Sequence, residues 1–284
     1  MIRVHRGLEP AELVRLRAEK LIELRGIVAR GMGDPLSDDI DGYRVVARAL
    51  WEAQLYKCCY CEKTIEHVRN DVEHYRPKAE ANRGGHHPVR HGYWWLAFTW
   101  ENLLFSCENC NQGIAKGVKF PLAAAGAPLV AEQSPNRYER PLLLNPAVEC
   151  GVEHIEFRLI PATKKWTPFA RGGSDQGDAT IRTCKLDRGD LLDLYTTHVN
   201  SHVRPEADAV NSALEKKDAV AIGRAVDRAN RMLLRRKRPF VGLSNDAIRH
   251  FVRTSDVASW GFAWHATTAE TLPIRGQSGK ALYR

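Results

Sequence analysis

The sequence contains no long hydrophobic run, and none of its apolar stretches approaches the roughly 20 residues that a helix needs to cross a bilayer. The first twenty residues, MIRVHRGLEPAELVRLRAEK, carry charges where a secretory signal needs an apolar stretch. Internal repeats and low-complexity tracts are also lacking. We therefore expect a cytoplasmic protein without a membrane partner, whose cysteines stay reduced.

The composition is that of an ordinary globular protein. Of 284 residues, 44% are hydrophobic and 27% are charged, which is enough for one large core or two smaller ones. The formal net charge of +8 favours a polyanionic partner, of which nucleic acid is the commonest.

Hydrophobic periodicity predicts an α+β chain in three parts. Residues 1–56 form a helical segment, and residues 57–122 form a compact core that holds most of the unusual motifs. Residues 123–284 form a mixed, mainly helical region, with a half-buried strand at 153–160 and helices from about 187 to 253. The leucines at helical spacing in the first part are Leu13, Leu16, Leu21 and Leu24.

Four of the seven cysteines form two C-x-x-C pairs, Cys58 with Cys61 and Cys107 with Cys110. In a reducing compartment such pairs indicate a metal site rather than disulfides. Four thiolates are the number that a tetrahedral structural zinc ion requires, and such a closed site leaves no position for a substrate. The remaining cysteines are expected to be small buried residues: Cys59, Cys150 and Cys184.

Chemistry must therefore come from residues between the two pairs. Here His74 follows Glu73, Asn102 precedes the second pair, and Asn111 follows Cys110 directly. Hydrolysis of a phosphodiester needs a base that activates water and a cation that stabilises charge on the phosphate. His74 can act as the base, while Asn111 with either Glu73 or Asp71 offers the oxygen ligands that Mg²⁺ or another divalent cation prefers.

The order of these motifs resembles that of zinc-bound HNH nucleases, in which two C-x-x-C pairs frame a ββα-metal core. The segments CCYCE, VEHYRPK, WENLLFSCENCN and KGVKFPL are similar to those of the PtuB nucleases of Septu and retron anti-phage systems. A weaker likeness continues through RPLLLNP and the C-terminal helices. The resemblance implies a zinc-stapled HNH core, embedded in a mostly helical chain, that cleaves nucleic acid. We expect DNA rather than RNA as the substrate, although the sequence leaves both open.

The resemblance also implies roles for single residues. His74 would be the general base, Asn102 would brace the loop that orients it, and Asn111 would bind the catalytic metal together with Glu73. Asn111 stands where such nucleases commonly have histidine, and the gap from Asn111 to Lys116 is longer than usual. The residues expected to contact nucleic acid in the core are Arg76, Lys78 and Lys116.

The implied partner is an ABC-type ATPase resembling PtuA, in some systems with a retron reverse transcriptase and its RNA and DNA. The contrasting hypothesis is a non-catalytic zinc module that binds nucleic acid or protein through basic surfaces.

Two further clusters are open to several interpretations. The histidines of the glycine-rich loop RGGHHPVRHG (His86, His87 and His91) can bind a second metal, contact the substrate backbone or be merely solvated. A row of arginines follows helical spacing opposite an apolar face and can track a phosphate backbone, dock a partner or form a solvated surface. We call this the arginine row: Arg224, Arg228, Arg231, Arg235 and Arg238. Within it, Arg228, Arg231 and Arg235 are the predicted nucleic-acid contacts.

Overall fold

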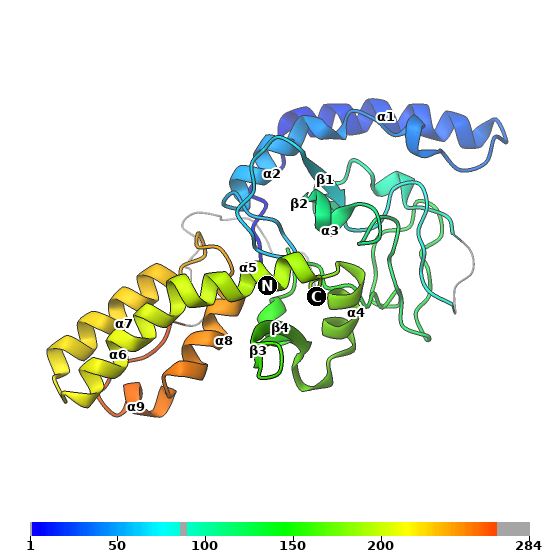
Figure 1. The fold of residues 1–284 in the computed structure, drawn as a ribbon. Coiled ribbons are helices and arrows are strands. Elements are labelled where there is room, and N and C mark those ends of the chain that lie inside the picture. Colours follow the sequence, from blue (N-terminus) through cyan, green and yellow to red (C-terminus); the bar gives the residue numbers. More distant parts are fainter. Residues whose placement is uncertain (1, 86–89, 266–284) are drawn as a thin grey trace.

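The computed structural model describes residues 2–85 and 90–265 and shows a mixture of helices and short strands (Figure 1). A long N-terminal helix runs along one side, two small sheets lie in the middle, and a bundle of C-terminal helices projects away from them. Within the described residues, no helix has the length and apolar character needed to cross a membrane.

The N-terminal segment is helical, as its leucine spacing predicts. Helix α1 (Ala11–Ala29) buries Leu13 and Leu24. Beyond the break that follows, Gly42 has a φ of 85°, a backbone conformation that glycine adopts more readily than other residues. The elements that flank this glycine are η1 (Ser37–Asp39), η2 (Tyr43–Val46) and α2 (Ala47–Ala53).

The central segment contains two antiparallel strands and a short helix in the order β1, β2, α3. Strand β1 (Asn70–His74) pairs with β2 (Leu103–Cys107), so that His74 lies opposite Leu103 at one end and Asn70 lies opposite Cys107 at the other. Helix α3 (Glu108–Asn111) follows β2 without a loop. Two 3-10 turns, η3 (Trp94–Leu96) and η4 (Trp100–Asn102), precede β2 and contribute buried aromatic side chains.

A second antiparallel sheet lies beyond residue 150. Strand β3 (Ile155–Ile160) was predicted from its alternating pattern, and it pairs with β4 (Lys165–Ala170), which was not predicted. Strand β4 contains Pro168, and proline is compatible only with the edge of a sheet, which both strands of a two-stranded sheet provide. The neighbouring short elements are η5 (Gly151–Glu153), η6 (Arg171–Gly173) and α4 (Asp175–Thr183).

The C-terminal region is helical, as predicted. Helix α7 buries Ile222, Val226 and Leu233, and the Asp218 side chain caps its start by accepting hydrogen bonds from two backbone N–H groups. A π-helical turn, η7, joins α5 to α6 without a loop. The bounds are α5 (Gly189–His198), η7 (Val199–Val203), α6 (Arg204–Glu215), α7 (Ala219–Leu233), α8 (Val241–Phe251) and α9 (Thr254–Ala258).

One continuous hydrophobic core joins the three parts of the chain, from Val4 to Trp264. Buried polar contacts reinforce the connection near the first cysteine pair. The Glu62 carboxylate accepts hydrogen bonds from the N–H groups of Ile2 and Gly242, and the Lys57 ammonium donates to the carbonyl oxygens of two residues that follow α7. The central segment is therefore tied to the N-terminal residues and to the chain between α7 and the start of α8.

Candidate functional site

The four predicted cysteines form a single buried cluster. Cys58 and Cys61 lie in a tight turn, Cys107 ends β2 and Cys110 lies in α3. Their sulfur atoms all lie within 4.8 Å of one another, and the Sγ atoms of Cys61 and Cys107 are 3.8 Å apart. Four sulfurs at about 2.3 Å from a tetrahedral zinc ion would be about 3.8 Å apart, so the cluster fits a zinc site.

The pKa values of the clustered thiols are also compatible with a bound cation. Burial opposes ionisation of Cys58, but hydrogen bonds from the other three cysteines of the cluster and from Cys59 outweigh this effect and lower the pKa of Cys58. The pKa values of Cys61 and Cys110 are raised, first by their hydrogen bonds with Cys107. The protein alone thus favours the thiolate form of Cys58 and disfavours that of Cys61 and Cys110, which a bound cation would stabilise. The other three cysteines are buried, as predicted.

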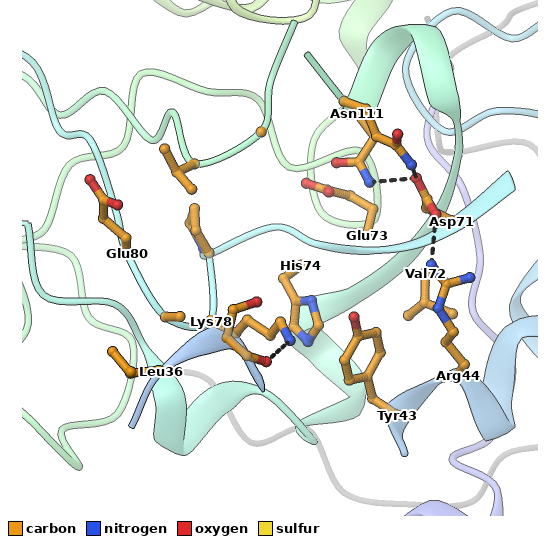
Figure 2. Close-up of a pocket in the computed structure, with 16 residues that line it drawn as sticks. Leu36, Tyr43, Arg44, Asp71, Val72, Glu73, His74, Lys78, Glu80 and Asn111 are labelled. Atoms are coloured by element: carbon orange, nitrogen blue, oxygen red, sulfur yellow. Dashed lines mark hydrogen bonds and ion pairs between the residues drawn. The ribbon is translucent and has the colours of Figure 1, made fainter. Parts of the chain in front are cut away.

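A cavity of about 450 Å³ opens beside β1 (Figure 2). Its wall comes from β1, from the start of the loop after β1, from α3 and the residues that follow it, and from the N-terminal segment around η1 and η2. It brings together most of the residues singled out between the cysteine pairs. The polar side chains that line it are Ser37, Tyr43, Arg44, Asp71, Glu73, His74, Lys78, Glu80, Asn111 and Gln112.

His74 is held at the end of β1 with one ring nitrogen engaged. Its Nε2 atom lies 2.9 Å from the carbonyl oxygen of Ala97, which can only accept a hydrogen bond. The neutral ring therefore carries its proton on Nε2, which leaves the lone pair of Nδ1 available. Burial lowers the pKa of His74 to about 3, so the imidazole is neutral at pH 7.

Asp71 lies three residues before His74 on β1 and accepts three hydrogen bonds. Its Oδ1 atom is 2.9 Å from Nη2 of Arg44, and its Oδ2 atom is 3.2 Å from Nδ2 of Asn111 and accepts from the Gln112 amide. Asp71 and Asn111 therefore form one polar group at the cavity wall. Arg44 and Gln112 were not among the predicted site residues.

Glu73 has a different partner. Its Oε1 atom lies 2.5 Å from the ammonium of Lys116 and accepts a hydrogen bond from Tyr60 at 3.2 Å. Burial raises the pKa of Glu73, while the adjacent ammonium opposes that rise. Where the sequence left Glu73 and Asp71 as alternatives, the structure places Asp71 with Asn111 and pairs Glu73 with Lys116.

A phosphate contact by Lys116, expected from the sequence, has no support in this geometry. The side chain is fully buried, and it also donates to the carbonyl oxygen of His74 at 2.9 Å. A cation without exposed surface cannot touch a bound phosphate, so Lys116 serves the interior of the site.

Asn102 lies behind the cavity wall. Its amide nitrogen donates to the carbonyl oxygens of Arg76 and Leu96, and its Oδ1 atom accepts from the N–H of Arg76 at 2.8 Å. These bonds tie the residues after His74 to the turn that supplies the Ala97 carbonyl. The bracing role that the resemblance implies for Asn102 is compatible with these bonds and stays a prediction.

The other two predicted basic contacts of the core are also engaged. Arg76 forms two hydrogen bonds with the buried carboxylate of Glu139, which leaves its side chain only 12% exposed. Lys78 lines the cavity but donates to the carbonyl oxygens of Ser37 and Ile40. Lys78 thus forms part of the cavity wall, whereas Arg76 is not among the residues that line the cavity.

The arginine row departs from the prediction in one respect. Helix α7 ends at Leu233, so Arg235 and Arg238 lie beyond it and do not share its face. On α7, Arg228 donates to the buried carboxylate of Glu206 from α6 at 3.0 Å, and Arg231 lies 3.6 Å from Asp227. Part of the positive charge is therefore neutralised.

The structure describes part of the histidine-rich loop. His86 and His87 lie outside the described residues. His91 bonds through Nδ1 to the carboxylate of Asp34, so its described contact is with an acid of the N-terminal segment.

Comparison with known proteins found no matching family model. The chain is 33% identical to the Septu protein PtuB of Bacillus mycoides (strain KBAB4) over 147 residues, which are 48% of this chain and 45% of that protein. It is 27% identical to the Septu protein PtuA of the same strain over 141 residues, which are 49% of this chain and 18% of PtuA. The matches thus span less than half of either relative. Over about half of its own length, the chain is homologous to the Septu protein PtuB, as the sequence motifs indicated.

Proposed function

We propose that the chain is a divalent-metal-dependent endonuclease of the HNH type that hydrolyses phosphodiester bonds of nucleic acid. The observation that carries this proposal is the state of His74, whose Nε2–H is committed to the Ala97 carbonyl while Nδ1 keeps its lone pair. The order β1, β2, α3, with His74 ending the first strand and Asn111 in the helix, supports the HNH assignment.

In this proposal His74 is the general base. Its Nδ1 accepts the proton of a water molecule as the water oxygen attacks phosphorus and the bond to the leaving oxygen breaks. A pKa of about 3 describes the site without substrate. The negative charge of a bound phosphate raises the pKa of a nearby imidazole and strengthens it as a base.

The carboxylate and amide oxygens at the cavity wall are suited to a hard divalent cation. Asp71 and Asn111, with Glu73 beside them, are the residues that would hold it (Figure 2). Such an ion, when bound, supplies positive charge to the phosphate and the leaving oxygen. Asn102 keeps the loop after His74 and the Ala97 turn in register and acts as a positioning residue.

Homology to PtuB also suggests the setting in which the enzyme acts. We place it in a Septu-type anti-phage system, with a PtuA-like protein as its partner and DNA as its substrate. A retron reverse transcriptase is not proposed as a partner, because both relatives are Septu proteins.

The test is cleavage of plasmid DNA and of RNA by the purified chain, with Mg²⁺ and with a chelator, alone and with a PtuA-like partner. We expect His74→Ala to lower the cleavage rate by about 10²–10⁴-fold, the usual contribution of a general base. His202→Ala is the matched control, because His202 is exposed in the π-helical turn of the C-terminal region.

A non-catalytic zinc module is the second candidate. It is favoured by the ion pairs that Asp71 and Glu73 already make with Arg44 and Lys116. The same assay separates the two: binding of nucleic acid without any Mg²⁺-dependent cleavage would contradict the nuclease. Equal cleavage by the His74→Ala variant would contradict His74 as the general base.

A further inference from the structure

One wall of the cavity is supplied by residues far upstream of the first cysteine pair. The segment 36–44 contributes Leu36, Ser37, Tyr43 and Arg44 to the lining, although the sequence placed it in the N-terminal helical part. The positive φ of Gly42 turns the chain immediately before Tyr43. Figure 2 shows the Tyr43 ring beside the His74 ring.

Tyr43 contacts the His74 imidazole directly. The two ring centroids are 4.5 Å apart and the planes meet at 77°, which is a favourable edge-to-face arrangement. The imidazole is attached to Cβ through Cγ, and its hydrogen bond to Ala97 holds Nε2, so the ring can still rotate about the axis through these two positions. A second, rigid aromatic contact removes that freedom and therefore sets where Nδ1 points.

Tyr43 is itself held in place by a second contact. The Lys78 ammonium lies 4.8 Å from the centroid of the Tyr43 ring, close enough for a cation–π interaction. The same ammonium donates to the carbonyl oxygens of Ser37 at 2.8 Å and Ile40 at 2.7 Å. Lys78 thus fastens the upstream segment to the loop that follows His74.

We infer that Tyr43 is a positioning residue for the general base, and that its aromatic ring rather than its hydroxyl group performs this role. The inference rests on the proposed function, since it assigns to Tyr43 the orientation of His74 for proton transfer. The contacts with His74 and Lys78 both involve the ring. Small displacements of a catalytic group are costly, so loss of the ring affects turnover more than substrate binding.

The experiment compares Tyr43→Phe, Tyr43→Leu and Tyr43→Ala in steady-state cleavage of plasmid DNA with Mg²⁺, using the full chain. We expect Tyr43→Ala and Tyr43→Leu to lower kcat by about 10- to 100-fold with little change in KM, and Tyr43→Phe to retain kcat within about twofold. Tyr43→Leu keeps bulk at the site, so it separates loss of the ring from loss of packing. Tyr138→Ala is the control, because Tyr138 is exposed and does not line the cavity.

A second readout does not depend on activity. The ring protons of His74, assigned by NMR in the zinc-loaded protein, should show a ring-current shift that Tyr43→Phe preserves and Tyr43→Leu removes. Thermal unfolding and zinc content of each variant check that the fold is intact.

The outcomes distinguish this inference from the proposed function. If the wild type cleaves, His74→Ala does not, and Tyr43→Leu keeps its full kcat, the role of Tyr43 is overturned while the nuclease stands. A Tyr43→Phe variant as slow as Tyr43→Ala would also overturn it, because the hydroxyl group would then be required. Equal cleavage by His74→Ala and the wild type would overturn His74 as the general base and the role of Tyr43 together, and absence of Mg²⁺-dependent cleavage by the wild type would overturn the nuclease as well.

Discussion

At the scale of single residues, the buried pair of Glu73 and Lys116 shows how closely stability and function are combined in this site. The Lys116 ammonium is fully enclosed and serves both the Glu73 carboxylate and the His74 carbonyl. A charge in such a position is tolerated only because its partner and its hydrogen bonds compensate for lost hydration. The pair therefore holds the end of β1, where His74 lies.

Replacing one member of this pair should destabilise the protein strongly. We expect Lys116→Met to lower the free energy of unfolding by about 3–5 kcal/mol, because Glu73 is left as an uncompensated buried charge. Adding Glu73→Gln should restore part of the loss, since the charge is then removed. Denaturant unfolding with zinc present measures both changes.

The surface pair of Arg48 and Glu52 provides the comparison. Both side chains are largely exposed, so Glu52→Gln should change stability by less than about 1 kcal/mol. An equally small effect of Lys116→Met would show that the buried pair does not stabilise the fold.

At the scale of elements, the cysteine cluster joins the turn after α2 to the end of β2 and to α3. Arg188, from the turn before α5, extends the connection by donating to Cys110 Sγ at 3.4 Å. Burial lowers the pKa of Arg188, but the nearby Cys110 and Cys61 outweigh the effect of burial, so that the pKa is raised. A cation in the cluster would thus hold together elements that frame the cavity.

Loss of one thiolate should therefore affect the whole central segment. We expect Cys107→Ser to lower the zinc content and the melting temperature, because a bound structural zinc contributes on the order of 10 kcal/mol of apparent binding energy in small domains. Elemental analysis and thermal unfolding measure the two effects. Cys59→Ala is the matched control, since Cys59 is buried beside Cys58 but lies outside the cluster. Well-folded wild-type protein without zinc would contradict the assignment of the metal.

At the scale of the whole molecule, the net charge is +8, but several of the basic side chains are paired with carboxylates. Arg76, Lys116 and Arg228 are committed to the carboxylates of Glu139, Glu73 and Glu206. Exposed arginines remain on and after α7. If the arginine row binds nucleic acid, the arginines that are not paired with a buried carboxylate supply most of the electrostatic attraction.

The structure indicates which residues of the row to change. Arg228 should be retained, because a glutamate there would repel the buried Glu206. Reversing Arg224, Arg231 and Arg235 to glutamate should weaken DNA binding uniformly across sequences and flatten its salt dependence, because fewer counterions are released. The control reverses the same number of exposed charges elsewhere: Arg15, Arg30 and Arg48.

Binding isotherms at several salt concentrations, together with pull-down of a PtuA-like partner, separate the possible uses of the row. Intact DNA binding with loss of the partner would assign the row to docking. If neither changes, the row is a solvated surface.

The sequence by itself determined those features that depend on local spacing. Two-residue gaps place both sulfurs of a C-x-x-C pair on one side of a turn, so the cysteine cluster could be predicted, as could strand β3 and the helices from their periodicity. The motif order also identified the homology to PtuB. The roles of His74, Asn102 and Asn111 remain predictions, although the structure places the three around one cavity wall and the turn behind it.

Only the tertiary structure decided which partners these residues have. Three contacts of the site join residues that are 31 to 43 positions apart along the chain. They are the pairing of Asp71 with Asn111, the burial of Lys116 against Glu73, and the contact of Tyr43 with His74. Such contacts depend on how helices and strands pack and on which charges packing removes from water. Neither appears in the spacing of residues along a chain, and for this reason the wall built by segment 36–44 could not be predicted from the sequence.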